Sequence, residues 1–108
     1  MTTAVTTADF ETEVLHSEHP VIVDFWADWC GPCHLVSPVL EQIAEERAGE
    51  LRVVKVNVEE QPELAMRYGV RSLPTIVLFS EGKPSAAAIG ARPKKALEKS
   101  LGLASDEA

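Results

Sequence analysis

The spacing of hydrophobic residues along this chain alternates between that of a strand and that of a helix, which predicts strands separated by helices. The run from Val21 to Ala27 is apolar except at Asp24, which indicates a strand covered on both faces. Residues 51–58 return to a period of two with many β-branched side chains, and residues 75–79 form a third strand-like run. From Pro32 the period becomes helical, up to a stop at Gly49, with apolar residues at Val36, Val39, Leu40, Ile43 and Ala44.

Three further helices are predicted from turn and capping residues at their ends. Thr7 can cap the first helix, which carries Phe10 and Val14 on one face and ends before Pro20. The other two begin at prolines and are the segments from Pro62 to Gly69 and from Pro93 through Leu97 and Leu101.

The order of these elements predicts an α/β fold built on a mixed sheet. A strand, a helix and a strand in succession form a crossover unit, so residues 21–27 and 51–58 should run parallel. A tight turn at residues 80–83 should lead to a weaker strand at 86–89, antiparallel to its predecessor. We expect one domain over residues 1–108, with the first few threonine-rich residues and the acidic tail, about 104–108, as loose ends.

Composition and charge narrow the class of function. The formal net charge of -7 repels phosphate backbones, so nucleic-acid binding is not expected. The N-terminus carries no basic and apolar signal, and no apolar stretch approaches the roughly 20 residues that cross a bilayer. Two cysteines in one Cys-x-x-Cys pattern favour a reducing compartment over a disulfide-stapled secreted module. We therefore expect a cytoplasmic protein without a membrane partner.

Cys30 and Cys33 carry the clearest chemistry. They follow a buried strand and open a helix, where unpaired backbone N–H groups and the helix dipole favour a thiolate over a thiol. Cys30 is therefore the expected nucleophile, and Cys33, about one turn inward, the expected resolving thiol. Asp24 is a carboxylate within an apolar strand, so burial should raise its pKa toward the range that suits proton transfer near neutral pH.

Six features of the chain resemble the thioredoxin family in their order and spacing. They are Trp29-Cys30-Gly31-Pro32-Cys33, Asp24-Phe25-Trp26-Ala27, Pro38, Lys55-Val56-Asn57, Leu73-Pro74-Thr75 and Gly90. The resemblance spans nearly the whole chain. It implies a thioredoxin fold, with a central mixed five-stranded sheet flanked by about four helices.

The resemblance also implies roles for individual residues. Asp24 would accept the proton of Cys33, and Gly31, Pro32 and Lys55 would tune the redox pair. A cis-proline at Pro74 would face the dithiol, and the surface that docks the client protein would comprise Trp29, Leu73, Pro74 and Gly90. Ser72 departs from the family, in which a glycine often stands at this position.

The implied activity is reduction of disulfides in client proteins, because Gly31-Pro32 resembles the reducing thioredoxins. The implied partners are the client proteins and a flavin-dependent thioredoxin reductase that supplies electrons from NADPH. The domain itself would need no bound cofactor beyond its own Cys30–Cys33 disulfide. We expect a monomer.

Two other functions fit parts of the sequence. Cys30-Gly31-Pro32-Cys33-His34 matches the pattern for covalent haem attachment, although such cytochromes are mostly helical and exported. His16, His19, Cys30 and Cys33 could instead bind zinc in a structural module. Otherwise His34 is a helix-surface residue at a position where thioredoxins often have lysine or arginine.

Overall fold

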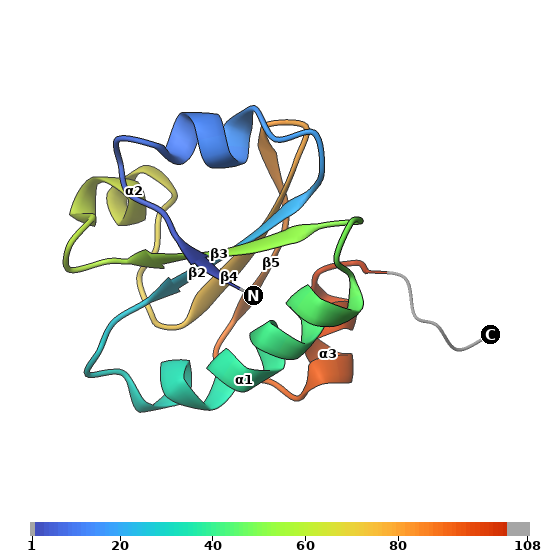
Figure 1. Ribbon diagram of the computed structural model, residues 1–108. Helices are drawn as coiled ribbons and strands as arrows, with labels where there is room; N and C mark the ends of the chain where they lie inside the picture. Colours follow the sequence, from blue (N-terminus) through green and yellow to red (C-terminus); the bar gives the residue numbers. More distant parts are fainter. Residues whose placement is uncertain (1, 104–108) are drawn as a thin grey trace.

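A mixed five-stranded sheet forms the centre of the structure, a computed structural model that describes residues 2–103 (Figure 1). The strand order is β1-β3-β2-β4-β5, with β1, β3 and β2 parallel and β4 and β5 antiparallel to their neighbours. The predicted mixed sheet and its pairing directions are confirmed. The strands are β1 (Thr3–Ala4), β2 (Val21–Trp26), β3 (Arg52–Asn57), β4 (Thr75–Ser80) and β5 (Lys83–Ile89).

Helices cover both faces of the sheet, and each face has its own apolar layer. The helices are η1, a π-helix (Glu11–Leu15), α1 (Gly31–Glu46), α2 (Pro62–Arg67) and α3 (Lys94–Ser100). In Figure 1, α1 and α3 lie on one side of the sheet and η1 and α2 on the other. Ile22 of β2 packs in the layer beneath α1 and α3, whereas Val23 and Phe25 pack in the opposite layer. This explains why β2 is apolar on both faces.

The N-terminal segment differs from the prediction of a loose end. Thr3 and Ala4 form β1 and pair with Val54 and Lys55 of β3, and the Val5 N–H donates to the Lys55 carbonyl at 2.9 Å. A strand of two exposed residues leaves too short a pattern to be recognised in the sequence. The predicted loose tail, residues 104–108, lies outside the described residues.

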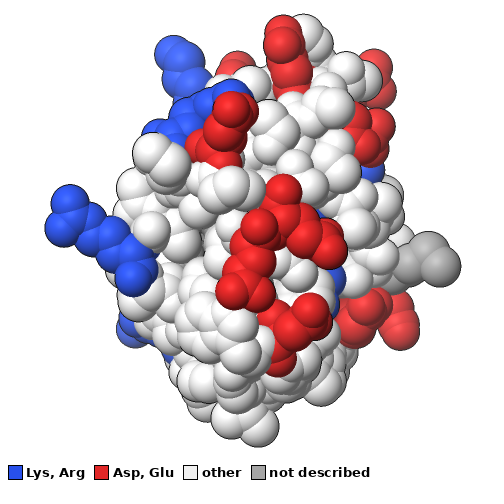
Figure 2. All heavy atoms as spheres, turned by 90° about the vertical axis from the view of Figure 1, so that its left-hand side faces the viewer, with Lys and Arg blue, Asp and Glu red and all other residues white. Residues whose placement is uncertain are grey.

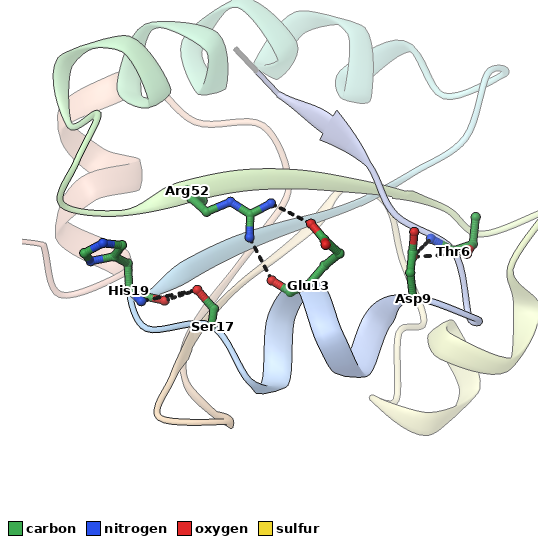
Figure 3. Close-up of polar contacts among 6 residues, drawn as sticks. All are labelled: Thr6, Asp9, Glu13, Ser17, His19 and Arg52. Atoms are coloured by element: carbon green, nitrogen blue, oxygen red, sulfur yellow. Dashed lines mark hydrogen bonds and ion pairs between the residues drawn. The ribbon is translucent and has the colours of Figure 1, made fainter.

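The first helix begins later than predicted, because Thr7 does not cap it. Figure 3 shows Asp9 instead turned back toward Thr6, whose N–H donates to Asp9 Oδ1 at 2.7 Å. The N–H and hydroxyl of Thr7 both donate to Gln61 Oε1 at 2.9 Å. The helix that follows starts at Glu11. Thr7 therefore joins the N-terminal segment to the start of α2.

Arg52 of β3 fastens η1 to the sheet (Figure 3). Its guanidinium donates to the Glu13 carbonyl and to Glu13 Oε1, both at 2.9 Å. Beyond η1, the Ser17 hydroxyl donates to the His19 carbonyl at 2.8 Å, and the His19 N–H donates to Ser17 Oγ at 3.2 Å. These contacts form the turn that leads into β2.

The last strand starts at Lys83, three residues before the predicted Ala86. The register between β4 and β5 shifts between Leu78 and Phe79, and Pro84 lies opposite Phe79. Proline and a register shift both weaken the strand signal in the sequence, which explains the late predicted start. Within residues 2–103, no helix has the length and apolar character that crossing a membrane requires.

Replacing Phe10 with alanine should strongly destabilise the fold. The ring is fully buried and contacts the rings of Tyr68 and Phe79 at centroid distances of 5.5 and 5.6 Å. Loss of this packing should lower the free energy of unfolding by about 3–5 kcal/mol, measured by urea denaturation of the oxidised protein. Met66→Ala, at an 80% exposed position, is the control and should change it by less than about 0.5 kcal/mol. Similar losses in the two variants would contradict the packing described for Phe10.

Candidate active site

The cysteine pair lies where β2 passes into α1. Figure 1 shows this junction at the lower left of the molecule. The Cys30 N–H donates to the Ala27 carbonyl at 3.1 Å, which closes the turn between the two elements. Cys30 is the N-cap of α1, and its sulfur accepts the backbone N–H of Cys33 at 3.2 Å. The two residues form a disulfide with their Cα atoms 5.3 Å apart. The predicted placement of the pair at a helix entrance is confirmed.

Both cysteines are nearly buried, with exposed fractions of 4% for Cys30 and 2% for Cys33. They pack with Ala27, and the side chains of Trp26, Val58 and Leu73 lie against this cluster. Gly31 and Pro32 are the first two residues of α1 and are exposed. Proline suits this position because the first N–H groups of a helix have no intrahelical partner. The disulfide is therefore held in an apolar setting beside an exposed surface.

Asp24 is completely buried in β2, and its environment disfavours the charged form. Among the described residues, no hydrogen bond reaches either carboxylate oxygen. Burial raises the pKa of Asp24 to about 7, and the positive charge of Lys55 opposes part of that rise. The predicted rise in pKa is thus found in the structure, and the group can gain or lose a proton near neutral pH.

Lys55 is the charged neighbour of Asp24 on the adjacent strand. The two residues are register partners in the parallel pair of β2 and β3. The Lys55 ammonium lies 4.4 Å from the centroid of the Trp26 ring and 3.5 Å from the Ser37 hydroxyl. Lys55 therefore acts on Asp24 through its charge while its ammonium contacts the indole.

The residues that the family resemblance assigns to client docking gather near the disulfide. Trp29 is 68% exposed, and Leu73 packs against the cysteine cluster. The Leu73–Pro74 peptide bond is cis. The Gly90 N–H donates to the Pro74 carbonyl at 2.9 Å, so the end of β5 is fixed to this segment.

The structure adds residues that the sequence did not single out. A hollow of about 230 Å³ opens beside Trp29 and is lined also by Val58, Ala65 and residues 70–73. Val58, Val70 and Arg71 belong to it and were missed. Arg71 and Ser72 directly precede Leu73-Pro74, and this adjacency was the available signal.

The two alternative functions do not fit the observed geometry. Within residues 2–103, no group of three or more His, Cys, Asp or Glu side chains is placed to hold a metal ion. His16 lies 3.5 Å from a carboxylate oxygen of Glu11. The zinc-binding hypothesis is therefore wrong for the described residues. A haem-attachment motif was expected in a mostly helical fold, whereas this motif lies at the end of a central strand.

Comparisons with known proteins agree with this geometry. The family model for thioredoxin matches residues 1–102. Thioredoxin 1 of Synechococcus elongatus is 49% identical over 98 residues, covering 91% of this chain and 92% of its own. Thioredoxin of Mycobacterium tuberculosis is 52% identical over 100 residues, covering 93% and 86% of the two chains. Thioredoxin of Porphyra purpurea is 50% identical over 97 residues, covering 90% and 91%.

A reversible disulfide at the junction of a central strand and a helix, on this mixed sheet, defines a thiol–disulfide oxidoreductase that acts on proteins. The fold is the thioredoxin fold. The chain belongs to the thioredoxin family.

Replacing Asp24 with asparagine should stabilise the protein above neutral pH. Because the pKa of Asp24 is about 7 in the folded protein against an ordinary 3.8, the folded state binds the proton more tightly. The wild-type free energy of unfolding should therefore fall as pH rises from about 4 to about 7, by up to about 4 kcal/mol from this group. The Asp24→Asn variant has no carboxylate to ionise at this position, so its free energy of unfolding should not show this fall. It should be the more stable protein at pH 8.

Chemical denaturation at pH 4.5 and pH 8 tests this expectation. The stability difference between Asp24→Asn and wild type should be several-fold larger at pH 8. Glu45→Gln removes one exposed carboxylate from α1 and is the matched control, expected to shift stability by less than about 0.5 kcal/mol at either pH. An equal difference at the two pH values would contradict the assignment.

Proposed function

We propose that this protein works in the reducing direction and transfers two electrons from its dithiol to disulfides in client proteins. The observation that carries the proposal is the position of the Cys30 sulfur, which accepts the Cys33 N–H at the start of α1. The same N–H and the positive end of the helix would stabilise a negative charge on that sulfur. Cys30 is thereby the better nucleophile of the pair.

The reaction consists of two exchanges. In the first, the Cys30 thiolate attacks one sulfur of the client disulfide, forming a Cys30–client bond and releasing the other client sulfur as a thiolate. In the second, the Cys33 sulfur loses its proton and attacks Cys30, which releases the client thiolate and leaves the Cys30–Cys33 disulfide. The client gains two electrons, and the released thiolates take up protons. The oxidised product of this sequence has the same bond as the structure.

Asp24 is the proposed acceptor of the Cys33 proton. It lies on the face of the sheet that α1 covers, as its β2 neighbour Ile22 does, and Cys33 is in the first turn of α1. With a pKa of about 7, the carboxylate can take the proton during the second exchange and return it to water. We propose transfer through an intervening water.

Three residues are proposed to tune the redox pair. Gly31 and Pro32 connect the cysteines within the first turn of α1, so they determine the geometry of the covalent ring that the disulfide closes. Lys55 lowers the pKa of Asp24 and so sets the pH range over which the carboxylate can accept a proton.

Client docking is proposed on the exposed surface around the disulfide. Trp29 offers a large apolar side chain, and the backbone of Leu73 would pair with an extended client segment. Pro74 is buried beside Leu73, and its carbonyl accepts the N–H of the half-buried Gly90, so we propose that these two residues border the docking surface. Holding the client disulfide in line with Cys30 is expected to supply much of the rate.

The proposed physiological setting is the cytoplasm, with NADPH as the electron source through a thioredoxin reductase.

The surface charge bears on the kind of partner. Figure 2 shows more acidic than basic side chains near the centre of the face seen there. Exposed Glu59, Glu60 and Glu63 lie in the segment before α2 and in its first turn. This charge supports partners that are proteins rather than nucleic acids. We also propose that residues 1–108 act as a single monomeric domain.

Serine variants of the two cysteines test the proposed roles. In an insulin-reduction assay with NADPH and a thioredoxin reductase, Cys30→Ser should abolish turnover because it removes the attacking sulfur. Cys33→Ser should still attack but accumulate a mixed disulfide, visible as a protein–insulin adduct on a non-reducing gel. An adduct on Cys30→Ser, or normal turnover by Cys33→Ser, would reverse or reject the assigned roles.

Trp29→Ala tests the docking surface. Removing this exposed side chain should raise KM for insulin roughly 5- to 30-fold, which corresponds to the loss of about 1–2 kcal/mol expected for an interface aromatic. The control is reduction of a small aromatic disulfide, which has no peptide segment for the docking surface to bind and should keep its rate within about twofold. A uniform loss with both substrates would show that Trp29 supports the disulfide rather than the client.

A further inference from the structure

His34 makes a specific contact that neither the activity nor the proposed docking surface explains. It is exposed in the first turn of α1, directly after Cys33. Its Nε2 atom lies 2.7 Å from the backbone carbonyl oxygen of Asp28, in the loop between β2 and α1. The side chain therefore joins the helix that carries Cys33 to the loop that presents Trp29.

The partner atom fixes the direction of this hydrogen bond. A carbonyl oxygen only accepts, so Nε2 must carry the proton and donate it. Neutral imidazole satisfies this in the tautomer with the proton on Nε2, and imidazolium satisfies it as well. The contact therefore does not depend on the charge of His34.

The indole ring of Trp26 makes a second contact with the His34 imidazole. Its ring meets the Trp26 ring edge-on, with centroids 6.2 Å apart and planes at 77°. Lys55 contacts the same indole, and Trp26 packs against the cysteine cluster. With its ring packed against Trp26, the imidazole loses little further freedom when it makes the bond to Asp28.

The middle of the loop, Asp28 and Trp29, has few other restraints among the described residues. Between Trp26 and α1, the turn from Ala27 to Cys30 is closed by one backbone hydrogen bond, at 3.1 Å. Asp28 and Trp29 at its centre are both exposed. Cys30, at the end of the turn, is joined to α1 by its disulfide and by the Cys33 N–H that its sulfur accepts. In the part of the chain that the structure describes, the bond from His34 is the side-chain contact that ties the middle of the turn, at Asp28, to the helix.

We propose that His34 is a positioning residue, which fixes the loop at Asp28 against α1 and so presents Trp29, beside Cys30, to a client in one arrangement. The inference rests on the proposed roles of Trp29 and Cys30. It assigns a function to the Nε2–H donor and not to a positive charge at this position.

Three variants separate the donor from the bulk of the side chain. His34→Gln places an amide N–H at nearly the distance of Nε2, His34→Asn carries the same amide one bond shorter, and His34→Leu keeps bulk without a donor. The insulin-reduction kcat/KM should fall about fivefold in the Leu and Asn variants, as expected for a hydrogen bond worth about 1 kcal/mol. It should stay within about twofold of wild type in the Gln variant.

Amide hydrogen exchange gives a readout that does not depend on turnover. The Cys30 N–H, bonded to the Ala27 carbonyl, should exchange faster in the Leu and Asn variants and at the wild-type rate in the Gln variant. Amides in the core of β2 should keep their protection in all three. If the wild-type protein did not reduce insulin, the proposed function would fail. The Cys30 amide exchange rates of wild type and the variants would still test the positioning role.

A comparison of rates at pH 6 and pH 8.5 separates the hydrogen bond from charge. The charged and titratable groups on neighbouring elements are Asp28 of the loop, Lys55 of β3, Asp24 of β2 and the two cysteines, and all are present in every variant. The ratio of wild-type to Leu-variant rates should therefore be the same at both pH values. A ratio that disappears at pH 8.5, a Gln variant as slow as the Leu variant, or unchanged Cys30 exchange in the Leu variant would each overturn the proposal.

Discussion

The hydrogen bond from the Cys33 N–H to the Cys30 sulfur is the interaction on which the site depends. It exists because β2 ends at Trp26 and a tight turn makes Cys30 the N-cap of α1. A cap normally uses a side-chain oxygen for an unpaired helix N–H, and here a sulfur takes that place. The sheet fixes the end of β2 through pairing with strands on both sides, and the position of the sulfur follows from that paired strand and the turn after it.

The second constraint is a carboxylic acid in a layer of apolar side chains. Asp24 weakens the fold whenever it is charged, and the positive charge of Lys55 offsets part of that cost. Replacing it with a hydrophobic residue would suit the core better. The proposed role as proton acceptor gives this buried acid a purpose, because a carboxyl that titrates near neutral pH can exchange protons at a pH where exposed acids stay ionised. Under that proposal, stability and activity place opposite demands on this position.

Much of the fold could be predicted because β2, α1, β3 and β4 each carry a long, regular pattern. The parts that could not be predicted depend on contacts between distant residues. β1 is two residues long and exists only through its pairing with β3, and Thr7 bonds to Gln61, 54 positions away, instead of capping a helix. Tertiary pairing overrode the local signal in both cases.

The residues of the candidate site also fall into those that the sequence could predict and those that it could not. Cys30, Cys33 and Asp24 could be identified because their residue types are chemically unusual in their settings. The docking residues Leu73, Pro74 and Gly90 came from the family resemblance, since spacing alone shows nothing about a cis bond or a surface. Val58, Val70 and Arg71 were missed because ordinary side chains become a lining only when the chain brings them together. The role of His34 required the distance to a carbonyl oxygen, which no sequence pattern contains.

The outer strand β5 has a further consequence for the behaviour of the protein in solution. It lies at the end of the sheet, where unpaired backbone groups could recruit a strand from another molecule. Its first residues are Lys83 and Pro84, and the register shifts beside them. A charged side chain, a residue without an N–H and a local twist all discourage edge-to-edge growth. The irregularity that obscured the first residues of this strand in the sequence thus guards the molecule against aggregation.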